Sequence, residues 1–279
     1  MKKQLQLGLV VEGNSTESTV LHLPKLVEEL GPVKSTVLRV ARRVSNMLKA
    51  GYAVADYEEL QAASLILLRV PDTSVPRVVD ELCSSELIFK DLSFVLCESW
   101  LPVDELSALT SKGAAVATLM SLPTHKKGSW FAVEGQAKAV RQIRQFLERN
   151  EVRSNEILPD SKHLLFASEL LATALPMPLL VAAQQALRAA GISGKVLSAL
   201  LEQIMQRMVQ DFLKGARANW GGPLTECSEE TGQIYLDQLR QSHPTMSSLI
   251  EEHLASGRQI MQAHRQGAEE LQSFRQAAP

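Results

Sequence analysis

Groups able to bind a phosphate follow the first apolar segment of the chain, in the stretch Val10–Ser18, which reads VVEGNSTES. A dinucleotide-binding loop at such a place carries three glycines, which permit a tight turn and close approach of the backbone to the pyrophosphate. Only Gly13 is present here. Asn14 opens a capping-box pattern, so the free amides of a helix start would lie beside Ser15. The pattern predicts either a phosphate site at Gly13, Asn14 and Ser15 or a capped helix without ligand, since the carboxylate of Glu12 would repel a phosphate.

Three arginines lie in and after the second predicted strand, Ser35–Val40. They are Arg39, Arg42 and Arg43, and no acidic residue lies among them. In NAD-binding folds an acidic side chain near this place holds the ribose 2′-hydroxyl, whereas arginine accommodates a 2′-phosphate, for which its planar guanidinium is suited. If a nucleotide binds, NADP is therefore favoured over NAD as the cofactor. The alternative is a solvated charged face without a ligand.

Short apolar runs alternate with helical stretches through the first half of the chain. Such runs suit strands that are buried on both faces of a parallel sheet. The alternation predicts an α/β, Rossmann-like doubly wound sheet over residues 1–155. The predicted strands are Leu5–Val11, Ser35–Val40, Leu65–Val70, Leu92–Cys97, Ala114–Met120 and Trp130–Gly135. The predicted helices are Ser18–Leu30, Ala41–Ala50, Val75–Leu82, Val103–Lys112 and Ala137–Arg149.

An all-α C-terminal domain is predicted for residues 156–279. Leu164–Ala190 is a long, alanine-rich apolar stretch interrupted by two prolines around Met177, which would kink a helix. Val196–Phe212 carries apolar residues at helical spacing. These apolar stripes exceed what one small helical domain buries internally, so we expect a homodimer formed through this domain.

The third predicted strand leads into a motif that resembles a known enzyme group. The strand ends in Val70, Pro71 and Asp72, and a V-P-D followed by a helix is similar to a segment of the 6-phosphogluconate dehydrogenase-like superfamily. The resemblance extends, with similar spacing, to Gly113–Leu119, Phe131–Gly135 (F-x-V-E-G) and Gly222–Pro223.

Within that superfamily the chain is most similar to a two-domain family that has a Rossmann-like N-terminus and an all-helical C-terminal domain of unknown function. That family is related to pyrroline-5-carboxylate reductase and ketopantoate reductase. The resemblance covers most of the chain and implies a dinucleotide cofactor, with Val70, Pro71 and Asp72 among the residues that contact it.

The sequence departs from the family where groups that line the substrate cleft are expected. The family's His-x-Ser-Gly after the fifth strand is Cys97–Trp100 here, so either the substrate differs or catalysis has been lost. Glu98 and Ser99 follow the carboxyl end of a strand, where ligands gather in open α/β sheets. Lys162 lies where related dehydrogenases place an active-site lysine. We take these three as catalytic candidates; for Lys162 the alternative is a solvated lysine at a domain junction.

A second set of polar residues predicts a substrate cleft in the helical domain. Glu169 lies in an apolar helix and needs a partner if it is buried; Lys162, two turns earlier, has suitable spacing. A cleft wall, or alternatively a capped turn, is predicted for Trp220, Thr225, Glu226 and Cys227. Cys97 and Cys227 have no neighbouring His or Lys in sequence, so we expect buried, inert thiols. The six histidines are scattered, and no metal site is predicted.

Composition limits the classes of function. Twenty-nine basic and 31 acidic residues give a net charge of −2, which argues against a nucleic-acid-binding surface. No apolar run reaches the ~20 residues of a membrane span, and no signal peptide or disulfide framework is recognised. We expect a cytoplasmic NADP-dependent oxidoreductase that transfers hydride to or from a small carbonyl or imine. The alternative is a catalytically inactive Rossmann-fold derivative, acting as a nucleotide sensor or protein-interaction module.

Overall fold

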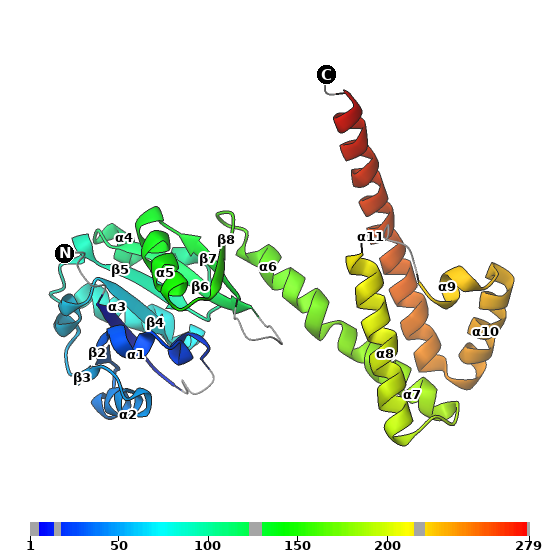
Figure 1. Ribbon diagram of the computed structural model, residues 1–279, viewed down its shortest axis with the longest axis horizontal. Coiled ribbons are helices and arrows are strands. Elements are labelled where there is room, and N and C mark those ends of the chain that lie inside the picture. Colours follow the sequence, from blue (N-terminus) through cyan, green and yellow to red (C-terminus); the bar gives the residue numbers. More distant parts are fainter. Residues whose placement is uncertain (1–5, 14–17, 123–129, 215–220, 278–279) are drawn as a thin grey trace. The chain divides into compact units, whose positions relative to one another are not determined.

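The computed structural model describes residues 6–13, 18–122, 130–214 and 221–277. The chain divides into two compact units, Met1–Ser168 and Glu169–Pro279, and each is described by itself. The first is a sheet unit and the second is helical, so the predicted fold class is confirmed (Figure 1). The predicted boundary at residues 155 and 156 lies earlier than this division, because the last strand of the sheet and most of the helix that follows it belong to the first unit.

The sheet unit contains eight described strands in the order β3-β2-β1-β4-β5-β6-β7-β8. They are β1 (Leu7–Val11), β2 (Leu30–Lys34), β3 (Tyr52–Val54), β4 (Leu65–Arg69), β5 (Ser93–Cys97), β6 (Ala115–Leu122), β7 (Trp130–Gly135) and β8 (Arg153–Glu156). Strands β1 to β6 are parallel, and β7 and β8 run in the opposite direction. The chain leaves β1 toward β2 and β3 and then returns to β4 on the other side, so the switch point lies between β1 and β4.

Helices cover both faces of the sheet (Figure 1). One core contains α2 (Leu38–Leu48) and α5 (Ala137–Arg149) with Leu7, Leu9 and Val11 of β1. The other contains α3 (Val75–Ser84) and α4 (Ser107–Ser111) with Val10. Because both faces of β1 are buried, its sequence is apolar at nearly every position rather than alternating. The remaining short helices of this unit are η1 (Val20–His22), α1 (Leu26–Glu29), η2 (Tyr57–Ala62), η3 (Asp72–Ser74), η4 (Phe89–Asp91) and η5 (Val103–Leu106).

The predicted strand Ser35–Val40 is wrong. The second strand is β2, Leu30–Lys34, and the helix α2 already begins at Leu38. In α2 the buried residues Ala41, Val44 and Ser45 have helical spacing, and this burial outweighs the strand signal of the β-branched residues Thr36, Val37 and Val40. Pro32 obscured the true strand, since proline lacks a backbone donor and is rare inside a sheet.

Other predicted elements of the sheet unit are confirmed or shortened. The helix Ala137–Arg149 is confirmed, and Val103–Lys112 is the continuous pair η5 and α4. The predicted helix Ser18–Leu30 is reduced to η1 and α1 within the described residues. The edge strands β3 and β8 were not predicted, because β3 has three residues and β8, which reads RSNE, is polar.

The second unit is helical throughout its described part, as predicted. It follows α6 (Lys162–Glu169) and comprises η6 (Leu170–Ala174), α7 (Pro176–Ala189), α8 (Gly194–Leu213), α9 (Pro223–Glu226), α10 (Glu229–Ser242) and α11 (Pro244–Ala277). Many of its apolar side chains are exposed, including Val196, Met208, Phe212 and Leu213. Leu197 is its one fully buried apolar side chain in the part with described burial.

The expectation that no apolar run approaches the length of a membrane span is wrong. Lys162–Ala189 is long and apolar enough to cross a membrane by length and composition, with a mean hydropathy of 1.8 in its most apolar window. None of that window is buried. A single helix of this kind is weak evidence for a membrane span, because an apolar face that packs against another protein chain has the same composition.

Candidate functional site

The carboxyl ends of β1 and β4 meet at the switch point of the sheet, where ligands bind in folds of this kind. Gly13 follows β1 with φ +69°, and a Cβ built on it would lie 3.1 Å from Cγ of Pro71. Two predicted cofactor residues thus lie next to each other at a place that favours glycine. Val70 is buried beside them, and Pro71 and Asp72 are exposed. Asn14 and Ser15 lie outside the described residues.

A charged cluster lies next to Gly13. The carboxylate of Glu12 accepts hydrogen bonds from the Thr36 hydroxyl and from the Arg77 guanidinium. Arg77 Nη1 also donates to Thr36 Oγ1 and to Glu81 Oε1, each at 2.8 Å. Tyr57 in turn donates to Glu81 Oε2 at 2.8 Å. Arg77 therefore neutralises the carboxylate that we expected to repel a phosphate, and 46% of its side chain remains exposed.

The three predicted phosphate-binding arginines lie on a helix and not on a strand. Arg39, Arg42 and Arg43 are all exposed on α2. Arg39 is in the first turn, close behind the carboxyl end of β2, and Arg42 and Arg43 are one turn further along. Of the three, Arg39 is thus placed nearest to the strand end where a ribose would bind in this fold.

Glu98 and Ser99 lie at the end of β5, as predicted, but their polar atoms have partners within the protein. Glu98 Oε2 accepts a hydrogen bond from Arg69 Nε at 2.9 Å, and its Oε1 accepts one from the amide of Val20 at 3.1 Å. Ser99 is 1% exposed, and its Oγ accepts a hydrogen bond from the amide of Leu101 at 3.1 Å. Glu98 therefore connects three segments at this edge of the sheet.

Lys162 is the first residue of α6 and is 5% exposed, so the alternative of a solvated lysine is wrong. Its ammonium donates to the carbonyl of Leu101 at 2.6 Å. Burial lowers the pKa of Lys162 from 10.5 to about 8, against the opposing effects of the Glu134 and Asp72 carboxylates. The same loop contacts α6 a second time, because the rings of Trp100 and Phe166 stack edge to face with centroids 5.2 Å apart.

The structure places most residues of the predicted cleft in the helical unit, and two of them, Thr225 and Cys227, form hydrogen bonds within their own turn. Glu169 Oε2 is buried without a hydrogen-bond partner in the described part of the chain. Thr225 Oγ1 donates to Gly222 O at 3.0 Å and Cys227 Sγ to Pro223 O at 2.8 Å, so both side chains bond to the backbone of their own short helix, which has no side-chain cap. Trp220 lies outside the described residues. Thr225, Glu226 and Cys227 are exposed.

The expectation of two buried thiols is confirmed for Cys97 and wrong for Cys227, which is exposed. Burial raises the pKa of the Cys97 thiol well above its usual range, which makes it unreactive. No group of three metal-binding side chains is found among the described residues.

Sequence reasoning missed the residues that organise the charged cluster. Arg77 and Thr36 are far apart in sequence, and only the crossover between β1, β2 and β4 brings them to Glu12. The sequence gives a signal only for the strand end nearby, through Arg69, a charged residue that ends an otherwise apolar strand and pairs with Glu98. Such a residue marks the strand end at which ligands gather.

A scan against family models finds no match for this chain, and a search of curated proteins finds none either. Solved structures match along almost its whole length. A protein from Thermotoga maritima is 16% identical, with a TM-score of 0.64, over 93% of this chain and 99% of its own. A pyrroline-5-carboxylate reductase from Coxiella burnetii is 14% identical, with a TM-score of 0.57, over 96% and 99% of the two chains.

An imine reductase from Myxococcus stipitatus in complex with NADP⁺ is 15% identical, with a TM-score of 0.63, over 90% of this chain and 95% of its own. The chain has the fold of these structures, a Rossmann-like sheet followed by helices. At these identities the likeness concerns the fold, and the activities named are those of the other proteins. This fold is the one that the resemblance seen in the sequence implied.

Proposed function

We propose that the protein is an NADP-dependent oxidoreductase that transfers hydride to or from a small carbonyl or imine substrate. The observation that carries this proposal is the close approach of Gly13 to Pro71 at the switch point, beside the exposed guanidinium of Arg77. A dinucleotide at such a place has its phosphates against glycine backbone and its ribose near the end of the second strand. The solved structures of similar fold include an imine reductase in complex with NADP⁺.

The residues present fit such a cofactor at its adenosine end. Gly13, Val70, Pro71 and Asp72 would line the backbone cradle. Arg39, with Arg42 and Arg43 behind it, would supply positive charge for a 2′-phosphate. When bound, the nicotinamide ring supplies or accepts the hydride, and the protein positions the substrate against it.

Lys162 is our candidate for the proton donor, because its pKa of about 8 lies nearer to neutral pH than that of an ordinary lysine. Its hydrogen bond to Leu101 O holds the ammonium at the end of β5. Glu98 acts as a positioning residue, since it fixes Arg69 and the start of η1.

We further propose that the helical unit forms a homodimer. Exposed apolar side chains such as Met208 and Phe212 on α8 would be covered by the second copy, and patches of exposed apolar residues mark protein interfaces. If the second copy also covered the apolar side chains of the candidate span within Lys162–Ala189, their exposure would be explained in the same way.

A calorimetric titration with NADPH and with NADH tests the cofactor proposal. We expect tighter binding of NADPH, and a loss of about tenfold or more in its affinity in Arg39→Glu, because one phosphate contact is replaced by repulsion. Arg141→Glu is the matched control, since it changes the net charge equally and Arg141 is exposed on α5, which packs on β5 and β6, away from β2 and α2. Absence of binding for both nucleotides would refute the proposal.

The second candidate is a catalytically inactive nucleotide sensor. It is favoured by the internal partners of Glu98, Ser99 and Lys162, which leave each predicted catalytic group hydrogen-bonded to the protein itself. Under this hypothesis NADPH binds, but a panel of cyclic imines and carbonyl compounds gives no oxidation of NADPH above the rate without protein. Turnover that is lost in Lys162→Met would decide for the enzyme.

A further inference from the structure

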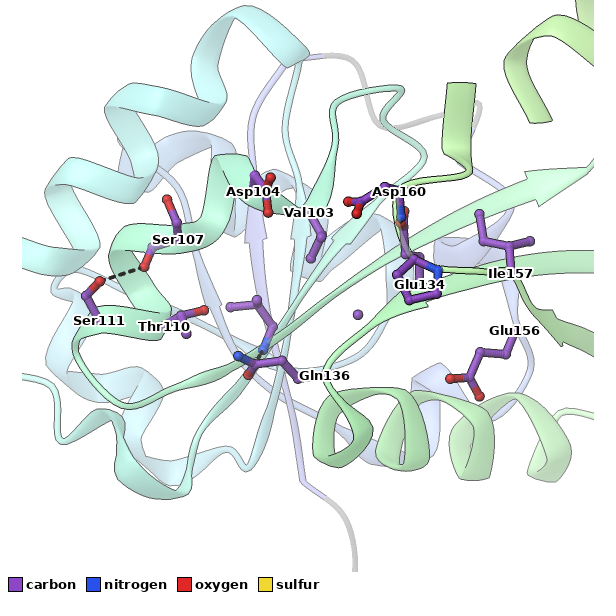
Figure 2. Close-up of a pocket in the computed structure, with 13 residues that line it drawn as sticks. Val103, Asp104, Ser107, Thr110, Ser111, Glu134, Gln136, Glu156, Ile157 and Asp160 are labelled. Atoms are coloured by element: carbon purple, nitrogen blue, oxygen red, sulfur yellow. Dashed lines mark hydrogen bonds between the residues drawn. The ribbon is translucent and has the colours of Figure 1, made fainter. Parts of the chain in front are cut away.

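A pocket of about 380 Å³ lies within the sheet unit, beside α4 (Figure 2). Its wall on one side is formed by η5 and α4, and on the other by the end of β7 and residues 156–160. It shares no lining residue with the candidate cofactor site. Strand β7 is three strands from β4, a separation of about 14 Å across the sheet. The volume is in the range of small-molecule sites.

The lining of this pocket is acidic. Four of its side chains are carboxylates, namely Asp104, Glu134, Glu156 and Asp160, and none of its described lining residues is Lys or Arg. The hydroxyl groups of Ser107, Thr110 and Ser111 lie on the same wall as Asp104, across the pocket from Glu134, Glu156 and Asp160 (Figure 2). Arg144 approaches Glu156 at 3.7 Å, so one of the four charges is partly compensated.

Glu134 has an uncompensated polar atom. It belongs to the F-x-V-E-G motif, in which Phe131 and Val133 face one core and place Glu134 on the opposite face of β7. The residue is 3% exposed. Its Oε1 accepts the amide of Asp160 at 2.6 Å, whereas its Oε2 has no hydrogen-bond donor in the described part of the chain.

The charge of Lys162 acts on Glu134, but the two side chains do not form an ion pair. For Glu134 no ion pair within 4.0 Å is found among the described residues, and the ammonium of Lys162 donates to Leu101 O instead. A buried carboxylate without a full set of donors is costly. Because Oε2 itself is covered, a ligand in the pocket would relieve this cost through its positive charge and not through a hydrogen bond to that atom.

We propose that this pocket binds a small organic cation, a primary ammonium or guanidinium compound, with Glu134 as the carboxylate that meets the charge. The hydroxyls of Ser107 and Thr110 accept further N–H groups. The side chains of Val103 and Ile157, which also line the pocket, contact the alkyl part of the ligand. A bare metal ion is a poorer match, because no metal-binding cluster is found among the described residues.

The test is calorimetric titration of the whole protein with butylamine, butylguanidine and butan-1-ol, in the absence of any nucleotide. We expect saturable binding of both cations and none of the neutral alcohol. Glu134→Gln keeps an oxygen for the Asp160 amide and removes the charge, so affinity for the cations falls about tenfold or more. The matched control is Glu148→Gln. Glu148 is exposed on α5, which packs on the opposite core, so this change removes the same charge and leaves binding unchanged.

Asp104→Asn provides a second variant at an exposed position, so that a failure of Glu134→Gln to fold does not decide the matter. We expect it to weaken binding of the cations by a smaller factor than Glu134→Gln. The proposal is overturned if the alcohol binds as tightly as the amine, if neither cation binds, or if neither variant changes the affinity. Because no nucleotide is present, these outcomes are independent of the proposed cofactor.

Discussion

The lowered pKa of Lys162 predicts how stability depends on pH. The folded protein holds this lysine at a pKa of about 8, against 10.5 for a free lysine. Below pH 8 both states are protonated, and the folded state carries the full cost of a buried ammonium. Between about pH 8 and 10.5 the unfolded state binds more protons than the folded state, so stability rises with pH. At 1.36 kcal/mol for each pKa unit, the gain is about 3 kcal/mol.

The comparison that isolates this effect is with Lys162→Met, which keeps an unbranched side chain and removes the charge. The free energy of unfolding is measured in urea, through the fluorescence of Trp100 and Trp130 in the sheet unit, below pH 8 and above pH 10.5. Other groups titrate alike in both proteins and cancel. We expect the stability of the unaltered protein to rise by about 3 kcal/mol relative to the variant.

Lys138→Met is the matched control, because Lys138 also donates to a backbone carbonyl, that of Lys90 at 3.1 Å, but from an exposed position. Its difference from the unaltered protein should stay flat over the same pH range. A flat difference for Lys162→Met as well would mean that the ammonium is solvated as in a free lysine. The proposed role of Lys162 as proton donor would then lose its basis.

Two further changes test packing and association. Gly135 has φ +144°, and an added Cβ would lie 2.5 Å from Val116 O, so Gly135→Ala should lower the free energy of unfolding by about 3 kcal/mol. Gly113→Ala, at φ +97° with its nearest atom 4.0 Å away, should cost about 1 kcal/mol; equal losses would contradict the steric argument. In sedimentation equilibrium we expect a dimer, which Phe212→Glu shifts toward monomer and Arg207→Glu, exposed on the same helix, does not. A monomeric parent protein would refute the proposed interface.

Burial on both faces made most of the sheet predictable. Runs such as Leu65–Arg69 and Ser93–Cys97 are apolar at nearly every position, and this pattern has few interpretations. The edge strands β3 and β8 were not predicted because their residues are half-exposed. The sequence of β8 contains no apolar residue that would indicate a strand. The start of helix α2 was mistaken for a strand because the segment that leads into it, Ser35–Val40, contains three β-branched residues, while the buried stripe of the helix becomes visible only over its full length.

The candidate site was predictable in place and less so in detail. The expectation that Gly13, Pro71 and Glu98 follow the carboxyl ends of strands agrees with the structure, because it depends on topology alone. The partners of these residues depend on which strand lies next to which. Arg77 reaches Glu12 only because β4 returns to the side of β1, and a sequence without an established strand order does not contain that information.

The central position of β1 has a consequence for synthesis on the ribosome. Leu7 pairs with Leu65 of β4 on one side, and β2 covers the other side. Until β4 has been made, one edge of a wholly apolar strand has no partner. Such an edge is a template for pairing with other chains. We infer that a nascent chain arrested between β3 and β4 is the species of this protein most in need of a chaperone.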